Sequence, residues 1–211
     1  EAEHGVSVFY HGADMTKPDE IADMIRAAED RFGSVDVLVN NAGIQHTDPI
    51  EDFPADRWNA VIAINLSSAF HTMHAALPGM QKRGWGRIIN IASAHGLVAS
   101  VNKSAYVAAK HGIVGLTKVA ALENAQSGIT CNAICPGWVK TPLVVAQIEA
   151  RAEKNGTSIE QESQALLLEK QPSGQFTTVE QLAGAAVFLC SDVASNMTGT
   201  TMTLDGGWTA Q

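Results

Sequence analysis

The sequence predicts an α/β fold in which a doubly wound, mostly parallel sheet carries helices on both faces. Strand-like apolar runs alternate with helical patterns along all 211 residues. Several of these runs are apolar at almost every position, which is typical of strands covered on both faces. The helical segments are long enough to connect parallel strands by right-handed crossovers. No repeat, linker or low-complexity tract interrupts the pattern, so we expect a single domain over residues 1–211.

The first part of the chain alternates twice between strand and helix. Residues 6–10 (VSVFY) predict a short strand. A helix follows from Pro18, which suits a first helical position, to Gly33, which ends it. Residues 35–39 (VDVLV) predict a strand covered on both faces, and residues 55–82 predict one long helix.

The second part of the chain continues the alternation. The expected elements are a strand at residues 87–93, a helix at 104–126, a strand at 128–134, helices at 143–154, 158–169 and 179–189, and a last strand at 201–205.

Small, polar or turn-forming residues follow four of the expected strands. They are Asp14, residues 40–43, residues 93–95 and residues 136–138. Ligands of open parallel sheets bind beyond the carboxyl ends of the strands. We therefore expect these four loops to converge on one crevice.

Composition limits the classes of partner. The chain has 14 Lys and Arg against 22 Asp and Glu, a formal net charge of −8, with 45% apolar and 17% charged residues. This composition excludes a disordered chain. The negative charge without basic clusters argues against nucleic acid or an anionic membrane as the main partner. We see no signal peptide and no apolar run of the roughly 18 residues that a membrane span needs.

The cysteines and histidines predict neither a disulfide framework nor a metal site. Cys131, Cys135 and Cys190 are odd in number and lie in apolar contexts, which favours buried thiols of a cytoplasmic protein. His71 and His74 are three residues apart on a helix, but no carboxylate or third histidine accompanies them, so packing is the preferred interpretation.

Ser93, Tyr106 and Lys110 form the sharpest chemical pattern. Tyr106 and Lys110 are four residues apart, so they share one face of a helix. A nearby ammonium stabilises a phenolate and lowers the tyrosine pKa, which makes Tyr106 a workable acid and base near neutral pH. Ser93, at the end of the preceding strand, could bind the same substrate oxygen. A surface Tyr–Lys pair is the alternative when the pattern stands alone.

The context of this pattern resembles the short-chain dehydrogenase/reductase family across essentially the whole chain. NNAG follows one strand, IASAHG the next, YVAAK lies in the following helix, and PGWVKTP follows the strand beyond. The resemblance implies a Rossmann-like fold and an oxidoreductase. Longer stretches, including IINIASAHGLVAS and NKSAYVAAKHG, resemble the members that interconvert (R)-3-hydroxybutyrate and acetoacetate with NAD as homotetramers.

The resemblance implies a role for each matching residue. Tyr106 would be the acid and base, Ser93 would hold the substrate oxygen, and Lys110 would lower the tyrosine pKa and bind the nicotinamide ribose. Asn65 would interrupt the long helix and hold a water that links Lys110 to solvent. The cofactor would be bound by Asp14, Asn41, Ala42, Gly43, Tyr106, Lys110, Pro136, Gly137, Val139 and Thr141.

The substrate set implied by the resemblance is Gln45, His95, Lys103 and Gln147, with Trp138 packing on the methyl end. A short 3-hydroxy acid offers one carboxylate, so charge-assisted donors suit it. Trp208 would lie either near a subunit contact or at the rim of the site. No metal is implied.

The family's glycine-rich turn and second strand are not found in the 211 residues. The strand that selects NAD over NADP is therefore not in the sequence, and we expect the working protein to be longer. Two alternatives stay open: a reductase of 3-oxoacyl thioesters or another ketone, and a truncated, non-catalytic homologue that acts as a binding or oligomer-forming subunit.

The helix over residues 104–126 and the segment over residues 63–80 are apolar around most of their circumference. A helix that lies on one sheet face needs a single apolar stripe. The excess predicts pairing of these helices between subunits, and the end of the chain can supply a second contact for a homotetramer.

Overall fold

The computed structural model describes residues 4–210 and confirms the α/β fold class. Its parallel sheet has the order β1-β2-β3-β4. The strands are β1 (Val37–Asn40), β2 (Gly86–Ile91), β3 (Ile129–Pro136) and β4 (Thr201–Leu204). Each strand pairs in parallel with the next one along the chain. The carboxyl ends of all four strands therefore meet at one edge of the sheet.

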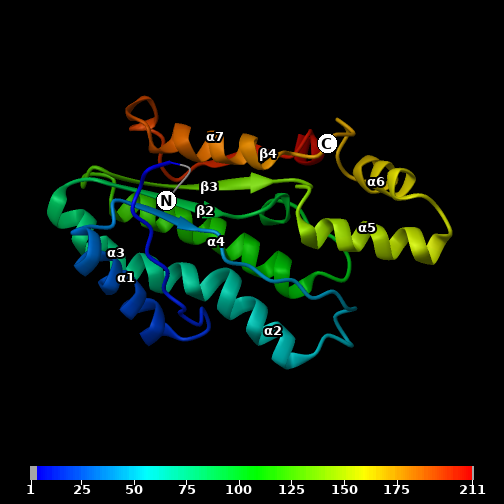
Figure 1. Cartoon of the computed structure of the whole chain (residues 1–211), viewed down its shortest axis with the longest axis horizontal. Helices are drawn as coiled ribbons and strands as arrows, with labels where there is room; N and C mark the ends of the chain where they lie inside the picture. Colours follow the sequence, from blue (N-terminus) through cyan, green and yellow to red (C-terminus); the bar gives the residue numbers. More distant parts are fainter. Residues whose placement is uncertain (1–3, 211) are drawn as a thin grey trace.

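Seven α-helices of the described chain surround this sheet. They are α1 (Pro18–Phe32), α2 (Ala55–Ile62), α3 (Ser68–Arg83), α4 (Ser104–Glu123), α5 (Pro142–Asn155), α6 (Ile159–Leu168) and α7 (Val179–Cys190). Figure 1 shows α3 and α4 on one side of the sheet and α7 on the other. From residue 18 onward the expected elements lie at the expected positions, with boundary shifts of a few residues.

Neighbouring residues of β2 show how the core divides between the two faces. Ile88 packs with Met73 and Met80 of α3, whereas Ile89 packs with Leu189 of α7. Successive side chains of a strand point to opposite faces, so an all-apolar strand serves both layers. This confirms the interpretation of the central apolar runs.

Two expectations for the first part of the chain were wrong. Residues 6–10 are not a strand, because in the described chain β1 pairs with β2 alone and a strand forms only beside a hydrogen-bonded neighbour. The strand near residues 35–39 is covered on one face only. Leu38 is buried, whereas Val37 and Val39 are 43% and 47% exposed, since α7 lies over β2 and β3 and does not extend across β1.

The long helix is confirmed and has an interruption at the expected residue. A π-helical turn (Ala63–Ser67) joins α2 to α3, and the Ser68 amide donates to the Ala63 carbonyl, five residues earlier. Asn65 is buried inside this turn. On α4, a Cβ at Gly112 would lie 2.7 Å from Leu66, so the glycine lets α4 pack closely against the turn.

The hydropathy of this helical segment is higher than expected, since the sequence predicts no apolar run long enough for a membrane span. By length and composition alone, Ala55–Arg83 is apolar enough to cross a membrane. This is weak evidence, because the core helix of a globular domain meets the same criterion. Here α3 packs on α1 and on strands β1 and β2, and α2 packs on α4.

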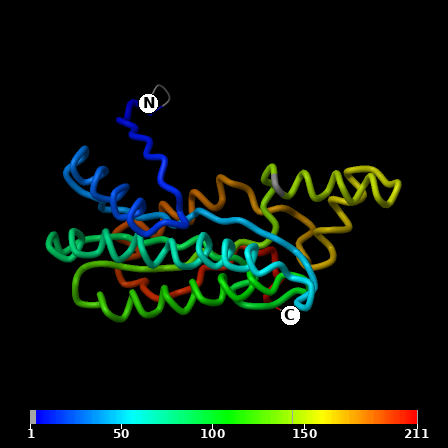
Figure 2. Tube along the Cα trace, turned by 90° about the horizontal axis from the view of Figure 1, so that it is seen from below, coloured from blue at the N-terminus to red at the C-terminus, as the bar shows by residue number. Residues whose placement is uncertain are grey.

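Helices α5 and α6 form a projecting flap between β3 and α7. They pack on each other through Val144, Ile148 and Leu166, with Trp138 and Phe176 at the edge of this small cluster. Figure 2 shows the pair extending away from the sheet and the other helices. Thr141 and Ser158 cap the two helices, as their positions before the helical patterns suggest.

Candidate active site

A cavity of about 220 Å³ lies at the carboxyl ends of the strands. It lies between the loops after β1, β2 and β3, the start of α4 and the flap helix α5. Its lining consists of Asn41, Gly43, Ile44, Gln45, Ile91, Ala92, Ser93, His95, Lys103, Tyr106, Lys110, Pro136, Gly137, Trp138, Val139, Thr141, Val144, Gln147 and Trp208. The expected convergence is therefore confirmed for three of the four loops.

The loop after β2 places Ser93 and His95. Ser93 caps a short 3₁₀ helix (Ala94–Gly96), and its Oγ accepts a hydrogen bond from the His95 amide at 3.1 Å. A Cβ at Gly96 would lie 2.8 Å from the backbone oxygen of Lys110, so glycine lets this loop lie directly on α4. Ser93 and His95 thus face the first turns of the helix that carries Tyr106.

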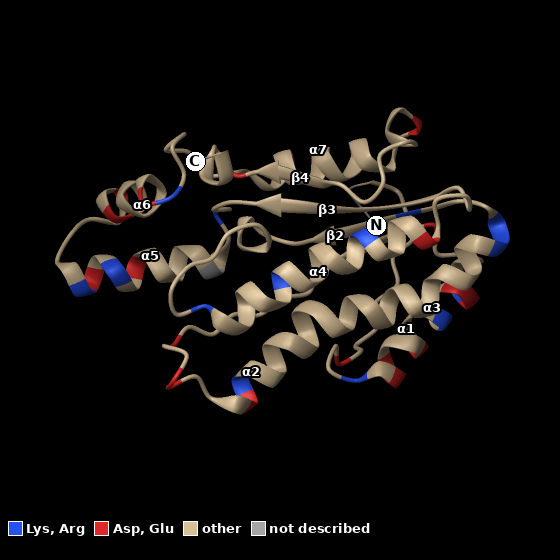
Figure 3. Cartoon of the chain, turned by 180° about the vertical axis from the view of Figure 1, so that it is seen from behind, with Lys and Arg blue, Asp and Glu red and all other residues tan. Residues whose placement is uncertain are grey.

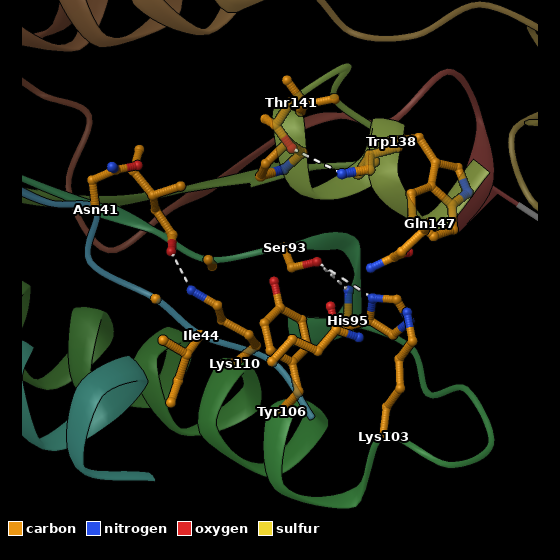
Figure 4. A pocket seen from close by; sticks show the side chains of 18 of the residues that line it. Asn41, Ile44, Ser93, His95, Lys103, Tyr106, Lys110, Trp138, Thr141 and Gln147 are labelled. Atoms are coloured by element: carbon orange, nitrogen blue, oxygen red, sulfur yellow. Dashed lines mark hydrogen bonds between the residues drawn. The ribbon is translucent and has the colours of Figure 1, made fainter. Parts of the chain in front are cut away.

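Tyr106 and Lys110 project from α4 into the cavity side by side. In Figure 4 the Tyr106 ring stands between Lys110 and His95, with its hydroxyl directed towards Ser93. Burial raises the pKa of Tyr106, and a hydrogen bond with Ser93 acts in the opposite direction. The Tyr106 pKa is thus influenced mainly by burial and by Ser93.

Lys110 is buried and makes a direct backbone contact. Its Nζ donates to the Ile91 carbonyl at 2.7 Å and lies 5.6 Å from the centre of the Tyr106 ring. Desolvation lowers the Lys110 pKa to about 8. The hydrogen bond that acts on the tyrosine pKa comes from Ser93, while the Lys110 ammonium is bonded to the strand. The expected lowering of the tyrosine pKa by Lys110 stays a prediction.

Both polar atoms of the Asn65 side chain form hydrogen bonds with the loop after β1. Its Oδ1 accepts from the Ile44 amide at 2.8 Å, and its Nδ2 donates to the Ile44 carbonyl at 2.9 Å. Asn65 therefore positions the loop that carries Gly43 and Gln45. Its expected contact with a relay water stays a prediction.

The other end of the cavity combines one cation with neutral donors. Burial, and to a lesser extent the charge of the nearby Lys103, lowers the pKa of His95 to about 4. His95 is therefore neutral at pH 7 and donates or accepts a hydrogen bond without carrying charge. Its Nε2 lies 3.0 Å from Ser100 Oγ. The positive charge at this end comes from Lys103, whose pKa burial also lowers.

Three aromatic contacts build the wall opposite Tyr106. Lys103 Nζ lies 5.2 Å from the Trp138 ring, and that ring stacks on Trp208 at a centroid distance of 5.9 Å. Trp208 in turn meets the His95 ring edge-on at 5.0 Å. Of the two positions left open for Trp208, the structure gives the one in the cavity wall.

Two buried donors in the cavity lining have no hydrogen-bond partner among the described residues. They are Gln45 Nε2 and Trp138 Nε1, and both residues line the cavity. A buried N–H without a hydrogen bond is costly, so both suit a ligand that carries acceptor oxygens.

Three expected site residues do not line this cavity. Asp14 is exposed and accepts bonds from the Thr16 amide and hydroxyl. Ala42 and Asn65 border a neighbouring pocket, which shares Asn41 with the main cavity. The roles expected for all three stay predictions. Among residues 4–210 no group of three or more His, Cys, Asp or Glu could hold a metal ion.

Four lining residues were not expected as part of the site. They are Ile44, Ile91, Ala92 and Val144. Ile44 adjoins Gly43, Ile91 and Ala92 belong to the IASAHG motif, and Val144 lies two residues after the PGWVKTP motif; this proximity is the only signal in the sequence. Together with Gly43, Pro136 and Gly137 they form the small and apolar part of the cavity lining, which suits the face of a flat ring.

The arrangement suits proton transfer at a substrate oxygen. Tyr106 and Ser93 offer two hydroxyls to one point, and Lys103, Gln45 and Gln147 lie around the same cavity. A buried phenol is a possible acid or base, and a cation a short way off can bind an anionic group.

Comparisons with known proteins agree with this site. The family described as Enoyl-(Acyl carrier protein) reductase matches residues 1–209. The D-beta-hydroxybutyrate dehydrogenase of Cupriavidus necator is 64% identical over 211 residues, covering 100% of this chain and 82% of that protein. The enzyme of the same name from Rhizobium meliloti is 60% identical, covering 97% and 80%. A crystal structure of levodione reductase superposes with a TM-score of 0.87 at 34% identity, covering 94% of this chain and 76% of that one.

Proposed function

Because the chain belongs to the short-chain dehydrogenase/reductase family, we propose that it interconverts (R)-3-hydroxybutyrate and acetoacetate with NAD. The observation that carries the proposal is the shared cavity, in which Ser93, Tyr106 and Lys110 lie opposite a cation at Lys103. The two relatives named for this activity, at 64% and 60% identity, support the choice of substrate. This would make the protein a dehydrogenase of one domain.

In the proposed mechanism Tyr106 accepts the proton of the substrate hydroxyl during oxidation and returns it during reduction. Ser93 donates a hydrogen bond to the same oxygen and holds it within reach of the phenol. Lys110 has a low enough pKa, about 8, to pass a proton on near neutral pH. Asn65 would help to link Lys110 to solvent.

The carboxylate of the substrate would lie against Lys103. One ammonium at this end of the cavity, with neutral donors from His95, Gln45 and Gln147, balances the single negative charge of the substrate. Trp138 and Trp208 close the apolar side, where the methyl end would pack.

NAD would supply the acceptor for the hydride. The small and apolar part of the lining at Gly43, Pro136 and Gly137 suits the nicotinamide ring, and Val139 and Thr141 line the same cavity. Lys110 would bind the ribose, Asn41 and Ala42 would line the path of the cofactor, and Asp14 would contact the adenine. Replacing NAD by NADP in the assay tests this choice of cofactor.

The test of the substrate is a pair of ketones, acetoacetate and its ethyl ester, with wild type and Lys103→Met. We expect the wild type to prefer acetoacetate, and the variant to lose on the order of 10²-fold in kcat/KM for acetoacetate, because a charge-assisted bond of about 2–3 kcal/mol is removed. The ester should change less than about threefold.

Other outcomes point to the alternatives. Equal efficiency of the wild type on both ketones would exclude a carboxylate-binding site and favour a reductase of thioesters or other ketones. Binding of NADH without turnover of any ketone would favour the non-catalytic homologue.

A further inference from the structure

The flap is joined to the sheet by two short segments that run side by side. The entering segment leaves β3 at Gly137, and the returning one reaches α7 through Thr177. The Thr177 amide donates to the Trp138 carbonyl at 2.9 Å, and Val139 pairs with Thr177 as a parallel bridge. Both segments are tied to the end of β4, where the Leu204 carbonyl accepts from the Gly137 amide and from Thr177 Oγ1.

Gln171 connects these two segments through its side chain. Its Oε1 accepts from the Trp138 amide at 2.8 Å, and its Nε2 donates to the Gln175 carbonyl. The side-chain amide of Gln171 therefore holds both Trp138, which lies in the cavity wall, and Gln175, which begins the returning segment. Gln171 is 1% exposed, although glutamine is usually a surface residue.

Two glycines make the space for this side chain. A Cβ at Gly137 would collide with Gln171 Oε1, and a Cβ at Gly206 would lie 2.6 Å from Gln171 Cγ. Gly137 and Gly206 follow the neighbouring strands β3 and β4, so they lie close together although they are far apart in the sequence. The Gln171 side chain thus fills a slot between the two glycines, and its Oε1 and Nε2 are both bonded to backbone groups.

Trp138 is the link from this slot to the cavity. Its amide is held by Gln171, while its ring lines the cavity and stacks on Trp208. Gln147 and Val144, on the flap helix α5, line the same wall. Any displacement of the flap base would move all of these residues relative to Ser93 and Tyr106, which belong to the sheet and α4.

We propose that Gln171 is a positioning residue that clasps the two ends of the flap and thereby fixes the substrate-binding wall formed by Trp138, Val144 and Gln147. It touches no reacting atom and acts through the Trp138 backbone. The kinetic part of its test depends on the proposed function, whereas the structural part does not.

The structural part is amide hydrogen exchange of Gln171→Leu, with Gln164→Leu as the control. Leu keeps the approximate volume of the side chain but bonds neither backbone group. We expect exchange at least tenfold faster at residues 137–141 and 174–177, with β2, β3 and α4 unchanged. Gln164 is an exposed residue of the same flap, so its variant should exchange like wild type. Unchanged exchange at both flap ends in folded Gln171→Leu would overturn the proposal.

The kinetic part uses acetoacetate and Gln171→Glu. A glutamate can accept from the Trp138 amide, but only its protonated form can also donate to the Gln175 carbonyl. Burial would raise the pKa of that glutamate, and so would the negative charge of Asp205, whose Cα and Cβ lie beside Gly137. Lys170 beside it in the chain is exposed.

We expect the variant to raise KM about tenfold at pH 8 with kcat within threefold. The ratio of its KM to that of wild type should fall towards one as the pH is lowered to 5.5. A KM ratio that does not change with pH contradicts the clasp, even if Gln171→Leu cannot be purified folded. If wild type does not turn over acetoacetate, the proposed function fails, and the exchange result alone decides on the clasp.

Discussion

Tyr106 lies in a setting that affects the acidity of its phenol in two directions. Burial raises its pKa, and the hydrogen bond with Ser93 lowers it. Ser93 would therefore do more than hold a substrate oxygen, because it also sets the pH range in which Tyr106 can act as a base. In the proposed mechanism Lys110, which is hydrogen-bonded to the Ile91 carbonyl, takes part in the next proton transfer after Tyr106.

The pH profile of Ser93→Ala tests this interpretation of Tyr106. Oxidation needs the phenolate as base, so its kcat/KM rises with pH through the Tyr106 pKa, whereas reduction needs the neutral phenol and falls. Removing the Ser93 hydroxyl removes the bond that lowers this pKa. We expect both midpoints to move to higher pH, with rates reduced on the order of 10-fold to 10²-fold. Profiles in both directions that extend above pH 10, the ordinary tyrosine pKa, provide the measurement.

Tyr106→Phe is the matched control for that experiment. It should lower kcat on the order of 10²-fold or more and leave no tyrosine-dependent midpoint. A midpoint in Ser93→Ala at the wild-type pH or below it would contradict the role given to Ser93.

Residues of the site differ in how far the sequence could predict them. Ser93, Tyr106 and Lys110 were predictable because helical spacing and strand ends bring them together. The neutral state of His95 was not, since it depends on burial and on Lys103, which only the assembled fold sets. Gln171 gave no signal, because its slot is made by Gly137 and Gly206, both remote from it in sequence.

The π-helical turn is the element that joins the long helix to the cavity. Asn65 occupies the turn and bonds both backbone groups of Ile44, next to Gly43 and Gln45. The extra residue in the turn thus brings a side chain from α2–α3 to the loop after β1. Such turns often occur at functional sites.

Stability of Asn65→Leu tests this connection. Leucine has a similar size but removes both part-buried hydrogen bonds with the Ile44 amide and carbonyl, each of which contributes about 0.5–1.5 kcal/mol. We expect unfolding in urea to show a loss of about 1–3 kcal/mol. Asn59→Leu, at an exposed position of α2 with no hydrogen bond described for its side chain, should stay within about 0.5 kcal/mol. Equal losses in the two variants would contradict the connection.

Elements bounded by local signals were predicted better than those that depend on partners. Pro18 and Gly33 delimit α1 as expected, and Gly33 adopts the left-handed conformation at φ 88°. Residues 6–10 have a strand-like composition, but a strand exists only through its neighbours. Helix α4 ends three residues before the expected boundary, at Glu123, followed by Asn124, which is bonded to Gln81.

At the scale of the whole molecule, one outer face of α3 and α4 stays apolar and uncovered. Phe70 on α3 is 49% exposed, and Val119 and Leu122 on α4 are 50% and 78% exposed. His71 and His74 pack against Phe70 with their rings, as expected for residues in a packing role. Figure 3 shows no charged residue on the stretch of α2–α3 between Arg57 and Lys82. Such a face is unusual on a monomer and suits pairing of identical subunits.

We expect Val119→Asp to lower the mass of the assembly and the turnover together, because the protein is proposed to be a homotetramer paired through this face. Val119 points outward, whereas Leu116 packs partly against the core, so a charge at 119 disturbs the contact without opening the subunit. Tyr106 and Lys110 lie on the same helix, and its rigidity would depend on the neighbouring subunit. Ile159→Asp introduces the same charge at an exposed flap position and should change neither quantity. Light scattering at micromolar concentration gives the mass, and a fully active monomer of wild type or Val119→Asp would contradict the pairing.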